Sequence, residues 1–245
     1  MDNTLYVAMA GAVSSLEQQT LYSNNLANAN TAGFQSDIYQ AKTVYMTGSD
    51  LDSQAFSIAT NNGIDFKPGP LMTTGRDLDV AVKGQGYIAI QDSNGKEVYT
   101  RMGNFDVNQT GLLTTADGHV VLGDGGPITI PPAEKIQIAG DGTISIIPDG
   151  GDANSLAVLN RIKLVKPKPM DLVKNTQGFI ELKNGGQADA DAAVTLEVGA
   201  LENSNVNAIE QMINMIGASR EFEAHMKTMQ TVDENDQTLA RLLQL

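Results

Sequence analysis

The sequence predicts an α+β protein in which long N- and C-terminal helices pair as a coiled-coil-like core, with a central, mostly antiparallel β domain between them. Three observations lead to this prediction. Seven-residue spacing of apolar residues occurs at the two ends of the chain. Asp-Gly and Asn-Gly turn signals separate short β-branched runs in the middle. Hydrophobic residues make up 41% of the 245 residues, enough to build a folded core.

The N-terminal segment, residues 1–34, is predicted to be a core helix followed by a turn. From about residue 4 to residue 28 it contains no Pro and one Gly, Gly11. One series recurs every seven residues and a second follows its first members by four, which gives a narrow apolar seam: Leu5, Ala12, Gln19 and Leu26, with Met9 and Leu16. The run from Asn28 to Gly33 predicts the end of the helix, since Asn and Gly tolerate the left-handed conformation.

The C-terminal segment, residues 203–245, gives the stronger helix signal. Asn207 is a candidate N-cap, with Glu210 three residues later. Two seven-residue series are offset by three, and three isoleucines widen the first part of the stripe: Met212, Ser219, Met226, Asp233 and Ala240; Met215, Phe222, Met229, Asp236 and Leu243; Ile209, Ile213 and Ile216.

Between the helices we expect an extended connector over residues 35–69 and a β-rich outer domain over residues 70–202. The connector has little hydrophobic period of its own. In the outer domain, turn dipeptides such as Asn94-Gly95 and Asp141-Gly142 separate the runs that we expect to form strands: Leu78–Val82, Tyr87–Ile90, Lys135–Ile138, Thr143–Ile147 and Arg161–Val165.

The composition excludes several classes of function. With 16 Lys and Arg against 29 Asp and Glu, the formal net charge is −13, which argues against binding to nucleic acid or to an anionic membrane surface. The chain has no cysteine and two histidines, His119 and His225. Disulfides, thiolate metal sites and Cys nucleophiles are therefore excluded. We expect no enzyme activity, no cofactor and no metal site.

Three motifs have a simpler structural interpretation than a functional one. Gly84-Gln85-Gly86 begins a dinucleotide-like pattern, but a strand-like run follows it where a helix would be needed, so it predicts a turn. Asp189 and Asp191 lack the later ligands of a calcium loop and are expected to lie in an exposed acidic loop. His225 is expected to be a solvated helix residue.

Membrane and secretion signals are weak. No apolar run approaches the roughly 20 residues that span a bilayer. The first basic residue is Lys42, so a cleavable secretory signal with a positive first region is not expected.

The two helical seams contain polar and small residues, among them Gln19, Ser219 and Asp233. Such seams are too polar for a dry core within one molecule, and ordering about 60 residues costs on the order of 90 kcal/mol. We therefore expect chain ends that order on assembly with neighbouring subunits, the alternative being that both helices pack onto the β domain. Methionines on the last helix suit a surface that adapts to partners that are not identical.

The chain resembles the bacterial flagellar rod and hook proteins. Three ordered blocks of motifs carry the resemblance: Ser23–Phe34; Phe66–Leu71, Leu78–Ala81, Gly84–Tyr87, Tyr99–Arg101 and Gly103–Phe105; Leu201–Asn207, Arg220–Glu223 and Lys227–Asp233. Within the family, Met1-Asp2, Leu16–Gln19, Val121–Pro131 and Val232–Asn235 favour a proximal rod member.

The resemblance implies a structural subunit of the proximal rod of the flagellar basal body, which assembles through its terminal helices and transmits torque. A distal rod protein or another axial subunit is the alternative, and a small-ligand-binding or enzymatic β domain is a third reading. The resemblance also implies export without cleavage by the flagellar export apparatus, a place in the periplasm, and other rod subunits and further copies of itself as partners. Neither nucleic acid nor direct membrane insertion is expected.

The spacing and the resemblance together give the candidate assembly interface. It consists of seam positions on the two helices and of asparagines near the end of the first: Leu5, Met9, Ala12, Leu16, Gln19, Asn24, Asn25, Leu26, Asn28, Asn30, Met212, Met215, Ile216, Phe222, Met226, Met229 and Leu243.

Overall fold

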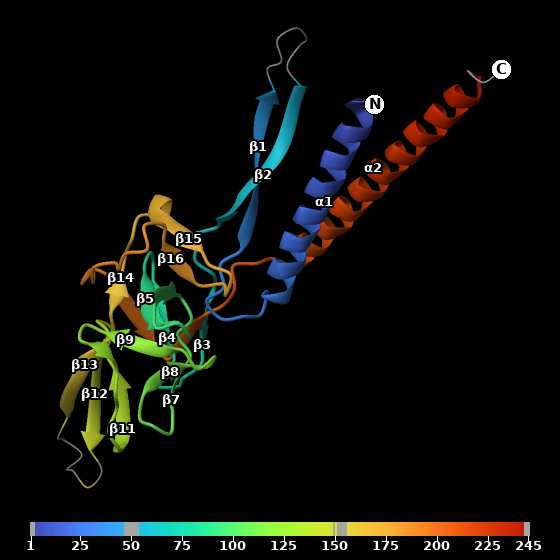
Figure 1. Cartoon of the computed structure of the whole chain (residues 1–245). Coiled ribbons are helices and arrows are strands. Elements are labelled where there is room, and N and C mark those ends of the chain that lie inside the picture. The colour runs from blue at the N-terminus through green and yellow to red at the C-terminus, as the bar shows by residue number, and fades with distance from the viewer. Residues whose placement is uncertain (1–2, 47–53, 149, 151–155, 243–245) are drawn as a thin grey trace. The chain divides into compact units, whose positions relative to one another are not determined.

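The computed structural model describes residues 3–46, 54–148, 150 and 156–242 (Figure 1). The chain forms two compact units: unit 1 comprises residues 1–29, 36–65 and 206–245, and unit 2 comprises residues 30–35 and 66–205. Both α-helices belong to unit 1, and antiparallel strands make up most of unit 2. The predicted α+β class is therefore confirmed.

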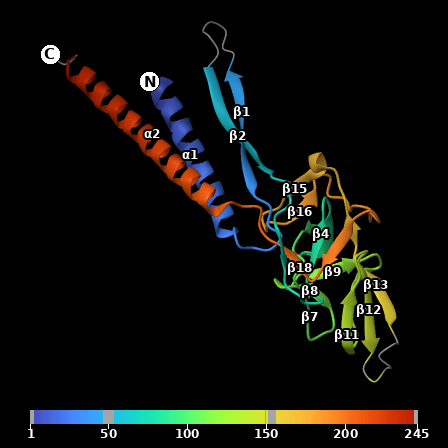
Figure 2. The same ribbon diagram turned by 180° about the vertical axis from the view of Figure 1, so that it is seen from behind.

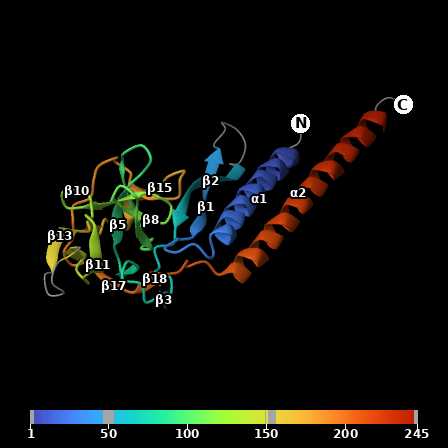
Figure 3. The same cartoon turned by 90° about the horizontal axis from the view of Figure 1, so that it is seen from below.

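Unit 1 contains two antiparallel helices, α1 (Asn3–Ala27) and α2 (Ala208–Leu242) (Figure 3). The predicted cap starts α2, because Oδ1 of Asn207 accepts hydrogen bonds from the backbone N–H groups of Ile209 and Glu210 at 3.1 and 3.4 Å. Asn25 of α1 bonds to Gln211, near the start of α2. The antiparallel register leaves the last turns of α2 extending past the start of α1 (Figure 1).

A β-hairpin completes unit 1. The sequence indicated an extended connector over residues 35–69, but the structure pairs two strands there, β1 (Asp37–Met46) and β2 (Gln54–Ile64). The hairpin lies beside α1, on the side away from α2 (Figure 2). The hydroxyls of Ser14 on α1 and Tyr39 on β1 are 2.7 Å apart, which ties hairpin and helix together.

The described strands of unit 2 form four antiparallel sheets. The largest has nine strands: β15 (Leu172–Lys174), β16 (Ile180–Leu182), β6 (Glu97–Thr100), β5 (Tyr87–Gln91), β9 (Val120–Gly123), β8 (Leu113–Thr115) and β7 (Phe105–Val107) in that order, with β14 (Leu164–Val165) on β5 and β10 (Gly126–Pro127) on β9. A second sheet has the order β11 (Ala133–Ile138), β12 (Thr143–Pro148) and β13 (Ala157–Arg161). Two pairs complete the unit: β17 (Thr195–Val198) with β4 (Val80–Lys83), and β18 (Ala200–Glu202) with β3 (Leu71–Thr73). A short 3₁₀ helix, η1 (Pro169–Asp171), precedes β15.

The core of unit 2 is formed mainly by β-branched side chains from these sheets, for example Ile88, Val98, Val121 and Ile144, which are all buried. The strand predictions agree with β4, β5, β11 and β12 to within one or two residues. The run predicted over residues 161–165 is wrong as a single strand. The chain leaves β13 at Arg161 and reaches β14 at Leu164, since Ile162 and Lys163 bond to Gly142 and Leu122 in the crossing between sheets.

In the part of the chain that the structure describes, neither helix combines the length and the apolar character that crossing a membrane requires.

Candidate assembly surfaces

The seam between α1 and α2 is lined by small residues on the α1 side. Ala8, Ala12 and Ser15 are buried there, and Gly11 lies against the imidazole of His225 so closely that a β-carbon would overlap the ring. His225 is half-buried, so the expectation of a solvated side chain is wrong. The two helices approach closely because α1 presents little more than backbone at these positions.

The seam follows only one of the two apolar series predicted for each helix. On α1, the series at positions 5, 12, 19 and 26 continues in the seam through Ala8, Ser15 and Tyr22, which each follow a member of the series by three residues. Met9 and Leu16, which follow by four, lie outside the seam, and their side chains are 49% and 44% exposed. On α2, the half-buried side chains of Met215, Phe222 and Met229 alternate with a second series four residues earlier: Gln211, Ala218, His225.

Asn25 joins the three elements of unit 1. Its side chain is 1% exposed, and its Nδ2 donates to the carbonyl of Asp37 at 2.9 Å and to Oε1 of Gln211 at 3.3 Å. The backbone N–H of Asp37 donates back to Oδ1 of Asn25 at 2.9 Å. The amide therefore holds the first residue of β1 as a neighbouring strand would, and it also reaches α2.

Each helix leaves a second apolar stripe uncovered. On α1 the exposed side chains recur at helical spacing, and on α2 they gather in the first three turns: Tyr6, Met9, Val13 and Leu16; Ile209, Met212, Ile213 and Ile216. Ile209 is 71% exposed. Contiguous exposed apolar surface of this kind is typical of a protein–protein interface.

The structure divides the candidate assembly residues into three groups. Ala12 and Asn25 are buried in unit 1, whereas six are half-buried: Gln19, Leu26, Asn28, Met215, Phe222 and Met229. Eight are exposed: Leu5, Met9, Leu16, Asn24, Asn30, Met212, Ile216 and Met226. Leu243 lies outside the described residues. Asn30 belongs to unit 2 and the others to unit 1.

Unit 2 contains a buried ion pair that the sequence did not reveal. The side chains of Arg101 and Glu202 are each 2% exposed. The Nε of Arg101 donates to both carboxylate oxygens of Glu202 at 2.9 and 2.8 Å. The remaining guanidinium N–H groups donate to the carbonyls of Gly86, Gly84 and Val82 at 2.8 to 3.2 Å. The charges are thus paired and hydrogen-bonded, as burial requires.

Glu202 also holds two glycine-containing segments of unit 2. The backbone N–H of Gly69 donates to its Oε1 at 2.9 Å, and the N–H of Gly33 donates to its carbonyl at 2.7 Å. Gly33 has φ +69° and packs against the backbone of Arg101, where a β-carbon would overlap. Only Gly satisfies both demands.

The ion pair explains why several motifs of the family resemblance occur together. The family resemblance includes the segments around Gly33, Gly69 and Arg101, the Gly84–Tyr87 turn and Leu201-Glu202. All of them meet at this one buried cluster. The predicted turn at Gly84-Gln85-Gly86 is confirmed between β4 and β5, and two of its carbonyls accept hydrogen bonds from Arg101.

Among the tyrosines whose side chains the structure describes, three have a raised pKa. Burial raises the pKa of Tyr87 to about 12, against the opposing effect of the nearby Arg101 charge, and its hydroxyl donates to Oε1 of Gln35 at 3.1 Å. Burial likewise raises the pKa of Tyr99 to about 12, although its hydroxyl accepts a hydrogen bond from the N–H of Ala188. Burial, together with the charge of Glu221, raises the pKa of Tyr22.

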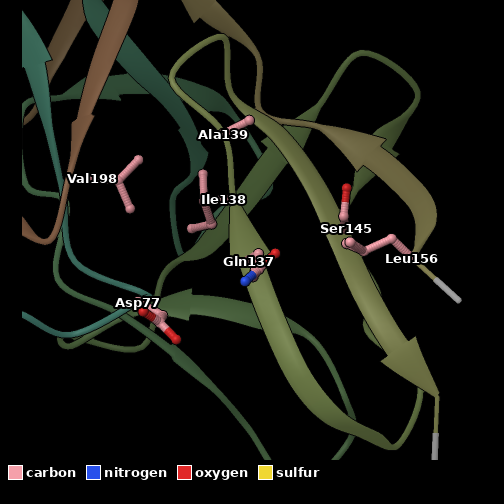
Figure 4. A pocket seen from close by; sticks show the side chains of 7 residues that line it. All are labelled: Asp77, Gln137, Ile138, Ala139, Ser145, Leu156 and Val198. Carbon is pink, nitrogen blue, oxygen red and sulfur yellow. The ribbon is translucent and has the colours of Figure 1, made fainter. Parts of the chain in front are cut away.

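An open groove of about 320 Å³ lies on unit 2 (Figure 4). Seven residues from β11, β12, β17 and neighbouring segments line it: Asp77, Gln137, Ile138, Ala139, Ser145, Leu156 and Val198. Asp77 is the one titratable group among these lining residues, so they provide no acid–base pair. Among the described residues no three His, Cys, Asp or Glu side chains gather as a metal site needs, and Oδ1 of Asp191 accepts a hydrogen bond from the N–H of Ala193.

Comparison with known proteins gives a consistent result along the chain. Residues 5–35 match the model of the flagella basal body rod protein, residues 81–146 that of the flagellar hook protein FlgE/F/G D1 domain, and residues 197–242 that of the flagellar basal body rod FlgEFG protein C-terminal. The flagellar basal-body rod proteins FlgF of Salmonella typhimurium and of Escherichia coli are each 39% identical, over 100% of both chains. The flagellar basal-body rod protein FlgG of Bacillus subtilis is 30% identical over 99% of both chains.

Proposed function

The chain belongs to the flagellar basal-body rod protein family, and on that premise we propose that it is a structural subunit of the proximal rod. The full-length similarity to two FlgF proteins carries this assignment. The three family models fall on α1, on the β unit and on α2, in the order that the predicted architecture requires. The protein is a structural component and not an enzyme, and it assembles with other rod components.

A distal position is the second candidate, because the FlgG protein of Bacillus subtilis also matches along its whole length, at 30% identity. The two positions differ in where the protein occurs in an intact basal body. Antibody labelling or density maps of purified basal bodies test this directly. We expect the protein in the first subunit layers of the rod, and its presence along the outer length would favour the distal assignment.

The assembly mechanism that we propose uses the terminal helices. The exposed stripes around Met9 on α1 and Ile213 on α2 provide apolar surface that neighbouring subunits would cover. At roughly 25 cal/mol for each Å² of apolar surface removed from water, covering such stripes stabilises the assembly substantially. Closely packed helices of this kind transmit torque because packed interiors are nearly incompressible.

Two further parts of the proposal concern ordering and transport. We propose that the chain ends order fully only on assembly, and that the protein reaches the periplasm uncleaved through the flagellar export apparatus. Limited proteolysis of the purified monomer tests the first part. Protease should trim residues 1–30 and 205–245 and leave unit 2 intact, whereas ends that resist protease and show strong amide protection would contradict it.

A further inference from the structure

The exposed apolar faces of the two helices lie at different levels of unit 1. Two contacts fix the register of α1 against α2: Asn25 bonds to Gln211, and Gly11 lies against the ring of His225. These contacts are 14 residues apart on both helices, so the register is constant between them. The face of α1 is therefore level with the middle of α2, whereas the face of α2 lies near its start. We call these faces the α1 stripe and the α2 stripe: Met9, Val13 and Leu16; Ile209, Met212, Ile213 and Ile216.

The two stripes match in length and in chemistry. Each extends over two helical turns, about 11 Å, from Met9 to Leu16 on α1 and from Ile209 to Ile216 on α2. Residues 3–16 carry no charge, and residues 208–219 carry one, Glu210. Two uncharged apolar surfaces of equal length can remove each other from water, and neither leaves an unpaired charge in the contact.

The outer face of α2 changes from apolar to charged after Ile216. The series continues at the same spacing of three and four residues in exposed charged side chains: Arg220, Glu223 and Lys227. In the register of one chain, Lys227 is level with Met9. A second copy beside the first without an axial shift would therefore bury these charges against an uncharged helix, which costs desolvation. A shift of about 11 residues, which is three turns or ~17 Å, places the α1 stripe of one copy on the α2 stripe of the other.

A glycine beside the α2 stripe has no explanation within the described chain. Gly217 lies inside α2, four residues after Ile213, and open space surrounds the place where its β-carbon would be. Glycine is unfavourable in a helix interior because it loses more conformational freedom than alanine. Gly11 has a reason within the chain, since a β-carbon there would overlap the ring of His225. At Gly217 the missing side chain instead allows a helix from outside the chain to approach closely.

We propose that the α1 stripe of one copy of this protein packs on the α2 stripe of the next copy, with an axial shift of about three helical turns, ~17 Å. The copies point in the same direction, so Met9 of one faces Ile216 of the other, beside Gly217. Because the contact joins two different faces, it is head-to-tail and repeats from copy to copy without closing into a dimer. A symmetric contact between two α1 stripes would leave both α2 stripes exposed. The inference rests on the proposed function and adds to it the partner surface and the shift.

Engineered disulfides in assembled basal bodies test the shift. The chain has no cysteine, so every cross-link must come from the introduced thiols. The double variant Met9→Cys/Ile216→Cys should give a ladder of dimers and larger oligomers on a non-reducing gel. Within one chain these two positions are separated by ~17 Å along the helix pair, too far for a disulfide. The matched control is Met9→Cys/Lys227→Cys, which would join copies that lie side by side without a shift, and it should give no ladder.

The outcomes separate this inference from the proposed function. A ladder from the control and none from Met9→Cys/Ile216→Cys would overturn the inference, and so would dimers of the single variant Met9→Cys, which would show a symmetric contact. Basal bodies that contain both double variants but give no ladder from either would also overturn it and leave the proposed function standing. Absence of the unmodified protein from basal bodies would overturn the proposed function itself.

A substitution at Gly217 gives a second test, in motile cells. Gly217→Leu should lose motility and, in the Met9→Cys/Ile216→Cys background, the ladder, because the added side chain blocks the approach of the next copy. Leu is a better helix former than Gly, so α2 itself should not be weakened. Ala224→Leu is the matched control, since Ala224 is also exposed and lies seven residues later, on the same side of α2 but beyond the α2 stripe. Equal motility of the two Leu variants would overturn the proposal.

Discussion

Replacement of Glu202 by Gln tests whether the buried ion pair holds unit 2 together. Gln keeps the shape of the side chain but removes the negative charge opposite Arg101, which is 2% exposed and cannot reach water. Breaking a buried pair by neutralising one partner typically costs about 3–5 kcal/mol. Both carboxylate oxygens of Glu202 accept hydrogen bonds from Arg101, and one also accepts the N–H of Gly69, so the amide NH₂ of Gln would face a donor in either orientation; we expect the cost to fall within this range.

The assay should report on unit 2 alone, because unfolding of the two units need not coincide. Amide exchange followed by mass spectrometry of peptides that contain Ile88 and Val121, both buried in the core, meets this requirement. A loss of about 3–5 kcal/mol corresponds to exchange roughly 10²–10⁴ times faster, where exchange proceeds through unfolding of the unit.

The matched control is Glu197→Gln, which breaks the exposed pair between Lys83 and Glu197 in the same unit. Their side chains are 52% and 44% exposed, and such pairs contribute about 0–1 kcal/mol. Added salt should remove the effect of the control and leave that of Glu202→Gln largely unchanged, because buried charges are screened little. A cost for Glu202→Gln no larger than that of the control would refute the reasoning.

Three further predictions concern the helix pair and the tyrosines. Gly11→Ala should destabilise unit 1 of the assembled protein by up to about 2 kcal/mol, because its β-carbon overlaps the imidazole of His225. In a His225→Ala background it should instead stabilise by about 1 kcal/mol. Denaturant-induced disassembly of basal bodies that carry each of the four chains measures this coupling, and additive effects would contradict the contact. Phe222→Asp places a charge in the seam and should abolish incorporation into the rod and motility, while amide exchange in unit 2 stays normal. Phe222→Leu is the control and should be tolerated. Motile Phe222→Asp cells would refute the role of the seam. The folded protein holds the protons of Tyr87 and Tyr99 up to about pH 12, whereas the unfolded chain releases them near pH 10, so the free energy of unfolding should be at its full value below pH 10 and fall between pH 10 and 12. The fall should be on the order of 2–3 kcal/mol for each tyrosine. Denaturant titrations across this range should show a smaller fall for Tyr87→Phe, and an equal fall would exclude that tyrosine as a cause.

The elements that the sequence predicted well are those with local signals. The cap at Asn207 and the turn at Gly84–Gly86 each depend on a few adjacent residues, so the local sequence is enough to predict them. The hairpin over residues 37–64 lacked such a signal, because its strands do not alternate strictly between apolar and polar residues. The pairing of Arg101 with Glu202 joins residues 101 positions apart, and no spacing rule connects them.

The helix seam shows why the candidate assembly residues were only partly placed. Periodicity selected Met215, Phe222 and Met229 for one seam of α2, and their side chains are half-buried in the structure. On α1 the large residues Met9 and Leu16 were favoured over Ala8 and Ser15, because large apolar residues are usually the buried ones. Close approach of two backbones reverses that preference, and only the three-dimensional structure reveals it.

The distribution of side-chain size on α1 bears on whether unit 1 is complete by itself. A helix that only has to pack within its own chain buries its large apolar side chains and exposes polar ones. Here Ala8, Ala12 and Ser15 are buried, while Val13 and Met9 are half-exposed to water. Burying small residues contributes little hydrophobic free energy, at about 0.8 kcal/mol for each CH₂ group, whereas the exposed ones could contribute about 1.5–3 kcal/mol each. Most of the hydrophobic free energy that this face of α1 can provide therefore becomes available only when another subunit covers it.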